Sequence, residues 1–122
     1  MTRRCVVAAA AILSLAATVG AQELTRGPFL QLGATDSMTI VWRTAAPSTG
    51  AVEYGPDAGL GLTVESAGPA SEHVVALTGL SPGTEYHYRV LSDGAAAAVG
   101  LRFRTFPEPG SAGEFRVVLV GD

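Results

Sequence analysis

Short stretches of alternating apolar and polar residues follow one another along most of the chain, and none shows the 3.6-residue period of an amphipathic helix. In residues 37–44 the alternation places Ile40 and Trp42 on one face and Arg43 on the other, so we expect Trp42 in a core. Clusters of Gly, Pro, Asp and Ser separate the stretches, as turns do between strands. The predicted strands cover residues 28–33, 37–44, 50–55, 62–66, 73–80, 84–92 and 101–106.

The second half of the chain carries the clearest strand signals. In residues 84–92, Tyr86 and Tyr88 alternate in phase with Val90, which predicts that both rings lie inside. Asp93-Gly94 then has the composition of a tight hairpin turn. Seven short strands are the number found in an immunoglobulin-like or fibronectin type III sandwich, so we predict an all-β fold of that architecture.

The segment LSPGTEY, Leu80 to Tyr86, resembles the tyrosine corner of fibronectin type III domains. Leu80 can close the end of the core while Pro82-Gly83 turns the chain over it. Tyr86 can bury its ring and return its hydroxyl to an upstream backbone group, which satisfies a polar atom that is costly to bury alone. Trp42 on the second predicted strand fits the same family pattern. We therefore expect residues 22–106 to form a fibronectin type III-like sandwich.

The chain changes character after residue 106. Pro and Gly are concentrated in residues 107–114, which is typical of a linker. Residues 115–120 are then apolar at nearly every position, whereas the earlier strands alternate. A strand of this kind needs cover on both faces, as in a parallel sheet flanked by helices. We therefore expect residues 115–122 to be the first strand of a separate α/β domain whose other elements lie outside this sequence.

Gly121-Asp122 stands at the carboxyl end of that last predicted strand, where functional groups gather in open α/β sheets. Glycine permits a sharp turn, and the Asp122 carboxylate can bind a hard cation. The same ending also occurs in Rossmann-type and phosphoreceiver domains. A turn or helix-capping aspartate is the structural alternative.

The order of these parts resembles the N-terminal region of purple acid phosphatases. The residues that carry the resemblance are RGPFLQLGATDSMTIVWRT (26–44), the tyrosine corner, the Pro/Gly linker and FRVVLVGD (115–122). In that family the sandwich precedes a metallophosphoesterase domain whose first strand ends in Gly-Asp, so the resemblance implies that Asp122 is an iron ligand in the full-length enzyme. The other family motifs, an Asp with a nearby Tyr, an Asn-His pair and later His residues, would follow it.

The resemblance also implies the chemistry of the parent enzyme. Iron and a second divalent metal, Fe, Zn or Mn, would bind a phosphate ester and activate a water for attack on phosphorus. The present sequence contains one of the ligands, so we expect it to hold no cofactor and no catalytic residue, and to be inactive by itself. Its expected role is to brace the C-terminal phosphatase domain through intramolecular contact. The alternative is a stand-alone secreted binding or adhesion module.

Residues 1–21 have the three zones of a secretory signal peptide. Arg3 and Arg4 form the basic start, an apolar run covers residues 5–17, and Val19-Gly20-Ala21 suits a signal peptidase. We expect a secreted product, extracellular or periplasmic, with no membrane attachment after cleavage; the alternative is an uncleaved anchor. The one cysteine, Cys5, lies in this segment, so the mature domain depends on its core and not on disulfides.

The charge balance argues against nucleic acid as a partner. The chain has 8 basic and 11 acidic residues, a net charge of −3, and two of the arginines belong to the predicted signal peptide. The remaining arginines form no basic run, whereas nucleic-acid binding needs a basic patch.

Two further sets of side chains have the chemistry of ligand sites. His73 and His87 lie on different predicted strands with no cysteine or third histidine at ligand spacing, so both are predicted to be surface or strand-edge residues. Three arginines are predicted on the outer face of the last two strands, balanced by Glu85 and Asp93. An anion-binding stripe and a docking face for the phosphatase domain remain alternatives for these arginines. They are Arg89, Arg102 and Arg104.

Overall fold

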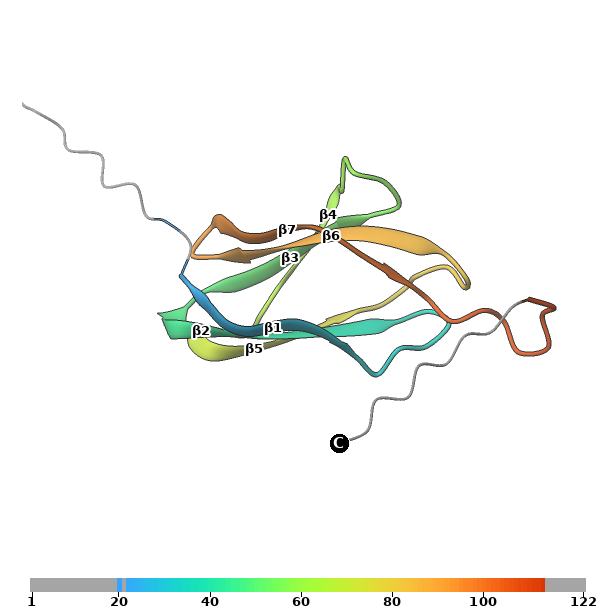
Figure 1. Ribbon diagram of the computed structural model, residues 1–122, viewed down its shortest axis with the longest axis horizontal. Helices are drawn as coiled ribbons and strands as arrows, with labels where there is room; N and C mark the ends of the chain where they lie inside the picture. The colour runs from blue at the N-terminus through green and yellow to red at the C-terminus, as the bar shows by residue number, and fades with distance from the viewer. Residues whose placement is uncertain (1–19, 21, 114–122) are drawn as a thin grey trace, which may run out of the picture.

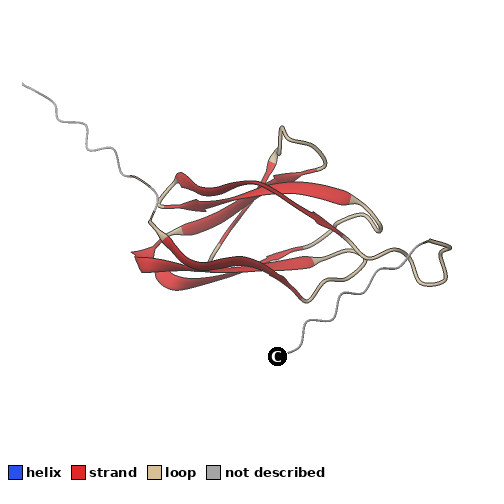
Figure 2. Ribbon diagram, in the orientation of Figure 1, coloured by secondary structure: helices blue, strands red, loops and turns tan. Residues whose placement is uncertain are grey.

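The computed structural model describes residue 20 and residues 22–113. All regular elements of this part of the chain are strands, and no helix occurs in it (Figure 2). The strands are β1 (Leu24–Gln31), β2 (Met38–Ser48), β3 (Gly50–Gly55), β4 (Leu62–Glu65), β5 (Ala70–Leu77), β6 (Glu85–Ser92) and β7 (Ala95–Arg104).

The strands form two antiparallel sheets that face each other (Figure 1). One sheet has three strands in the order β1-β2-β5, and the other has four in the order β4-β3-β6-β7. The described chain enters at one end of the sandwich and leaves at the opposite end. We call these the entry end and the exit end. The predicted all-β sandwich is confirmed.

The core lies between the two sheets and is built by alternation along each strand. In β2, for example, Ile40 and Trp42 are buried while Arg43 is exposed, because successive side chains of a strand point to opposite faces. Aromatic rings form part of the core: Tyr86 and Tyr88 both pack against Phe103. The buried apolar residues are Met38, Ile40, Trp42, Val52, Tyr54, Val75, Leu77, Leu80, Tyr86, Tyr88, Val90 and Phe103.

Three strands begin earlier than the sequence pattern predicts, and one of them is β5, which starts at Ala70 and not at residue 73. β7 starts at Ala95, directly after the hairpin turn, and includes a run of alanines whose side chains show no alternation of polarity. β1 starts at Leu24, ahead of Pro28, which is tolerated because β1 is an edge strand. Pairing with the neighbouring strand extends these segments, and a polarity pattern does not report on pairing.

The turn between β6 and β7 is the predicted hairpin turn. Asp93 and Gly94 both have positive φ, 49° and 76°, as a two-residue hairpin requires. The Asp93 carboxylate accepts a hydrogen bond from the backbone N–H of Thr49 at 3.0 Å. Asp93 therefore joins the β6–β7 turn to the β2–β3 turn.

Several predictions fall outside the described residues. They are the signal peptide up to residue 19, the strand of residues 115–120 and the metal ligand Asp122. The described residues include no helix of a length and apolarity that could span a membrane. Residues 107–113 of the predicted linker are described, and they form a turn held by the hydrogen bond from Ser111 N–H to the Glu108 carbonyl oxygen, at 3.1 Å.

Candidate functional site

The tyrosine corner closes the exit end of the sandwich. The Tyr86 hydroxyl accepts a hydrogen bond from the backbone N–H of Ser81 at 2.8 Å. Leu80 is buried beneath the turn, and its N–H donates to the carbonyl oxygen of Asp36 at 2.9 Å. Gly83 has a φ of 55°, a conformation that glycine adopts without steric cost. The corner therefore has the geometry that the LSPGTEY segment predicts.

Thr105 completes the exit end, a role that the sequence did not suggest. Its side chain is buried, with its hydroxyl donating to the carbonyl oxygen of Ser81 at 2.6 Å and accepting from the N–H of Thr84 at 2.9 Å. The next residue, Phe106, donates its N–H to the carbonyl oxygen of Ala34 at 3.0 Å. These bonds fix the direction in which the chain leaves the sandwich.

A group of hydroxyl side chains surrounds His73 near the entry end. The imidazole stacks on Trp42 with ring centroids 4.9 Å apart. Its Nδ1 lies 2.8 Å from the Oγ of Ser66, and its Nε2 lies 3.4 Å from the Oγ of Ser48. Ser48 in turn accepts a hydrogen bond from the hydroxyl of Ser92 at 3.0 Å. We call His73, Ser48, Ser66 and Ser92 the buried polar cluster, and through it hydrogen bonds join the two sheets.

The prediction that His73 lies on the surface is wrong. The side chain is 1% exposed, because His73 pairs with Trp42 across β2 and β5 and therefore points into the core. The period of residues 73–80 contains this information, since His73 shares its phase with Val75 and Leu77. His87, by contrast, lies on the outer face of β6, 3.8 Å from the Glu85 carboxylate.

The burial of His73 predicts a loss of stability in mild acid. Desolvation lowers the pKa of the imidazole from its usual 6.5 and outweighs the Ala70 backbone hydrogen bond and the Asp93 charge, which raise it. The unfolded chain therefore binds more protons in mild acid than the folded chain does. The contribution of neutral His73 to the free energy of unfolding is fully present above the pKa of the unfolded chain. It is lost as the pH falls toward the lower pKa of the folded chain.

Urea unfolding of the wild type and of His73→Gln, followed by circular dichroism between about pH 7.5 and pH 5.5, measures this contribution. We expect the free energy of unfolding to decrease toward acid in the wild type and to change less in His73→Gln. His87→Gln is the matched control and should keep the wild-type pH dependence. An equal pH dependence in His73→Gln and the wild type would contradict the assignment.

The three arginines of the second sheet each have a partner: two have a carboxylate and one has a backbone carbonyl oxygen. Arg89 forms an ion pair with Glu53, and Arg102 lies 3.5 Å from Glu85. Arg104 donates to the carbonyl oxygen of Gly83 at 2.9 Å. The prediction of a balanced face is confirmed for Arg89 and Arg102, but Glu53 and not Asp93 supplies the second negative charge.

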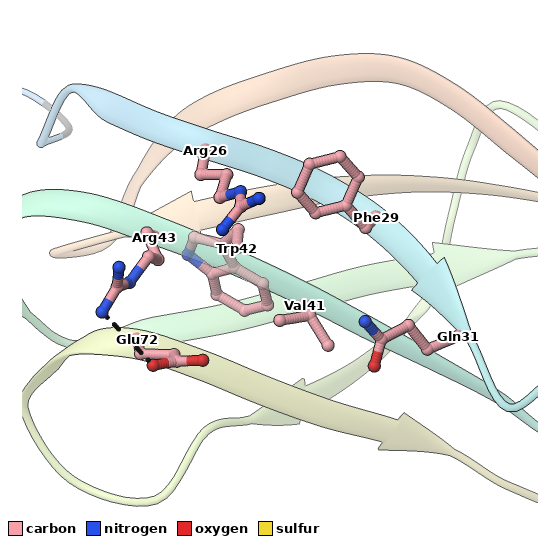
Figure 3. Close-up of a pocket in the computed structure, with 7 residues that line it drawn as sticks. All are labelled: Arg26, Phe29, Gln31, Val41, Trp42, Arg43 and Glu72. Carbon is pink, nitrogen blue, oxygen red and sulfur yellow. Dashed lines mark ion pairs between the residues drawn. The ribbon is translucent and has the colours of Figure 1, made fainter. Parts of the chain in front are cut away.

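A groove of about 370 Å³ lies on the outer face of the other sheet (Figure 3). Arg26 and Phe29 of β1 form one rim, and the guanidinium of Arg26 lies 5.8 Å from the centre of the Phe29 ring. Arg43 of β2 lies 3.5 Å from the carboxylate of Glu72 on β5. This groove could not be predicted from the sequence, because its residues come from three strands and Arg26 lies ahead of the predicted first strand.

The family model for the N-terminal domain of purple acid phosphatases matches residues 26–105. This range runs from the start of the groove to Thr105 at the exit end, and so contains nearly the whole sandwich. The chain belongs to the purple acid phosphatase N-terminal domain family. No match was found among curated proteins.

Solved structures share the fold of this purple acid phosphatase N-terminal domain at low sequence identity. One is the sensor domain of the anti-sigma factor RsgI4 from Pseudobacteroides cellulosolvens, with 13% identity and a TM-score of 0.53, covering 74% of this chain and 99% of that one. Another is the fibronectin type III domain of the human KIAA0970 protein, with 11% identity and a TM-score of 0.50, covering 84% and 86%. Both likenesses concern the fold alone, and the second is the fibronectin type III architecture predicted here.

The family implies metal cofactors in the parent enzyme, and the described residues do not provide a site for them. Among these residues no group of three or more His, Cys, Asp and Glu side chains is placed to hold a metal ion. Asp122, the ligand suggested by resemblance, lies outside the described residues.

The buried polar cluster contains a serine–histidine contact, which also occurs in hydrolases. Here Ser48 and His73 are 2% and 1% exposed, so a substrate cannot reach either side chain. A nucleophile must meet its substrate within bonding distance. The cluster is therefore structural: it satisfies buried polar atoms and fixes the two sheets relative to each other.

Proposed function

We propose that this chain is the accessory N-terminal sandwich of a secreted, metal-dependent phosphoesterase of the purple acid phosphatase type. The match of the family model over residues 26–105 carries the proposal. In this role the sandwich supports a catalytic domain that follows it in the full-length protein, and the chemistry on phosphate esters belongs to that domain.

The geometry of the exit end supports this role. Hydrogen bonds from Thr105 and Phe106 hold the departing chain against two loops, so a following domain would be attached at a fixed point. Residues 115–122 would then begin the catalytic domain, with Asp122 as an iron ligand. Secretion rests on the composition of residues 1–21.

A stand-alone secreted binding module is the second candidate, because the sandwich has a complete core of its own. The two candidates differ in what the intact gene encodes after residue 122. We expect an α/β domain with an Asp near a Tyr, an Asn-His pair and later His residues, and we expect the full product to hydrolyse a phosphate monoester. A stop codon at this position in the intact genome would contradict the proposal that the full-length protein is an enzyme. It would favour the binding module.

A further inference from the structure

The outer face of the three-stranded sheet carries its side chains in rows across the strands. Arg26 of β1 is directly opposite Arg43 of β2, which is directly opposite Glu72 of β5. The next row consists of Phe29, Val41 and Val74, in the same strand order. Phe29 is 45% exposed and Val74 is 59% exposed. A charged row thus borders an apolar row that water can reach (Figure 3).

The backbone of β1 is shaped to produce this arrangement. Two register shifts interrupt its pairing with β2, one on each side of Arg26. Between Arg26 and Phe29, Gly27 has a φ of 81°, and a Cβ there would lie 2.7 Å from the carbonyl oxygen of Val41. Bulges of this kind redirect side chains, and here the bulges bring the Arg26 guanidinium over the Phe29 ring.

The charged row has more positive than negative charge. Like charges directly opposite each other on neighbouring strands repel, and Arg26 faces Arg43 in this way. Glu72 offsets Arg43, whereas no carboxylate within the described residues lies in ion-pair distance of Arg26. Two arginines of the other sheet, Arg89 and Arg102, each have a carboxylate partner. The groove is therefore a place where an added anion would relieve a repulsion.

We propose that this groove binds a small organic anion, a carboxylate or phosphate group carried on an apolar body. The anionic group would bind Arg26 and Arg43, because guanidinium groups match the geometry of both oxyanions. The apolar body would lie on Phe29 and Val41, which line the groove, beside Val74 in the same row. A volume of about 370 Å³ is within the range of small-molecule sites. This binding goes beyond the proposed function and does not depend on it.

Titration of the isotope-labelled chain with benzoate and with phenyl phosphate, followed by amide chemical shifts, tests the proposal. We expect saturable shifts confined to residues 26–31, 41–43 and 72–74, with dissociation constants on the order of 1 mM. Response to both probes or to either one supports the site and tells which anion it prefers. Benzyl alcohol, which has the ring without the charge, should cause no saturable shift at the same concentration.

Matched variants separate this groove from other charged surfaces. Arg26→Ala should weaken binding at least about fivefold, and Glu72→Gln, which releases Arg43, should strengthen it about twofold or more. Arg102→Ala, on the other sheet, should leave it unchanged. The proposal is overturned if neither probe gives a saturable shift up to about 50 mM. It is equally overturned if Arg102→Ala weakens binding as much as Arg26→Ala does, or if benzyl alcohol binds as well as the two anions.

Discussion

Trp42→Ala should lower the free energy of unfolding by about 3 kcal/mol, at the lower end of the range for a buried aromatic residue. Trp42 is fully buried and stacks on His73, so its removal leaves a cavity in the core and exposes one side of the buried polar cluster to that cavity. The indole Nε1 has no hydrogen-bond partner within the described part of the chain. Burying this donor without a partner is unfavourable in the wild type, and Trp42→Ala removes that penalty. We therefore expect a loss at the lower end of the range.

Urea unfolding followed by circular dichroism measures this effect, since Trp42 is the one tryptophan of the chain and fluorescence would be lost with it. A small domain has a total stability of about 5–15 kcal/mol, so Trp42→Ala should move the unfolding midpoint far toward low urea. Val74→Ala, on the outer face of β5, is the control and should cost less than about 1 kcal/mol. A similar loss in both variants would contradict the placement of Trp42 in the core.

Tyr86→Ala should cost about 3–5 kcal/mol, because it removes both a buried ring and the tyrosine corner. The ring stacks against Phe103 with centroids 5.5 Å apart, and the hydroxyl accepts the hydrogen bond from Ser81 N–H. Without Tyr86 the turn over Leu80 loses the bond that ties it to β6. The free energy of unfolding, measured in urea as above, should therefore fall as much as for Trp42→Ala or further.

Comparison of Tyr86→Phe with Tyr86→Ala separates the contribution of the hydroxyl to stability from that of the ring. The phenylalanine keeps the packing and removes the acceptor for the Ser81 N–H. Because Ser81 is exposed, water can accept this hydrogen bond instead, and we expect the free energy of unfolding to fall by about 1 kcal/mol. If Tyr86→Phe were as damaging as Tyr86→Ala, the hydrogen bond and not the ring would hold the corner. If neither variant lost stability, the corner would have no structural role.

The sequence predicts the sandwich well because its strands are half-buried. One buried face forces alternation, and alternation is visible in the chain, as for Ile40 and Trp42 against Arg43. The tyrosine corner is equally visible because its residues are contiguous in the sequence. His73 differs because its polarity favours the surface, whereas its phase with Val75 and Leu77 places it in the core, where it is buried.

The groove on the outer face could not be predicted from sequence for a physical reason. Its shape depends on the two bulges that shift β1 against β2, and a bulge is a property of strand pairing and not of residue polarity. The rows of Arg26, Arg43 and Glu72 exist only in the observed register. The pairing of Arg89 with Glu53 likewise joins residues that are 36 positions apart.

The sandwich should be complete without residues 114–122, which would belong to another domain. The measurement that tests it most directly compares urea unfolding of residues 22–113 with that of residues 22–122, using circular dichroism and Trp42 fluorescence. We predict one cooperative transition in both, with free energies of unfolding that agree within about 0.5 kcal/mol, and better solubility of the shorter chain. Loss of cooperative unfolding in residues 22–113 would show that the last segment is part of the sandwich and would contradict the account.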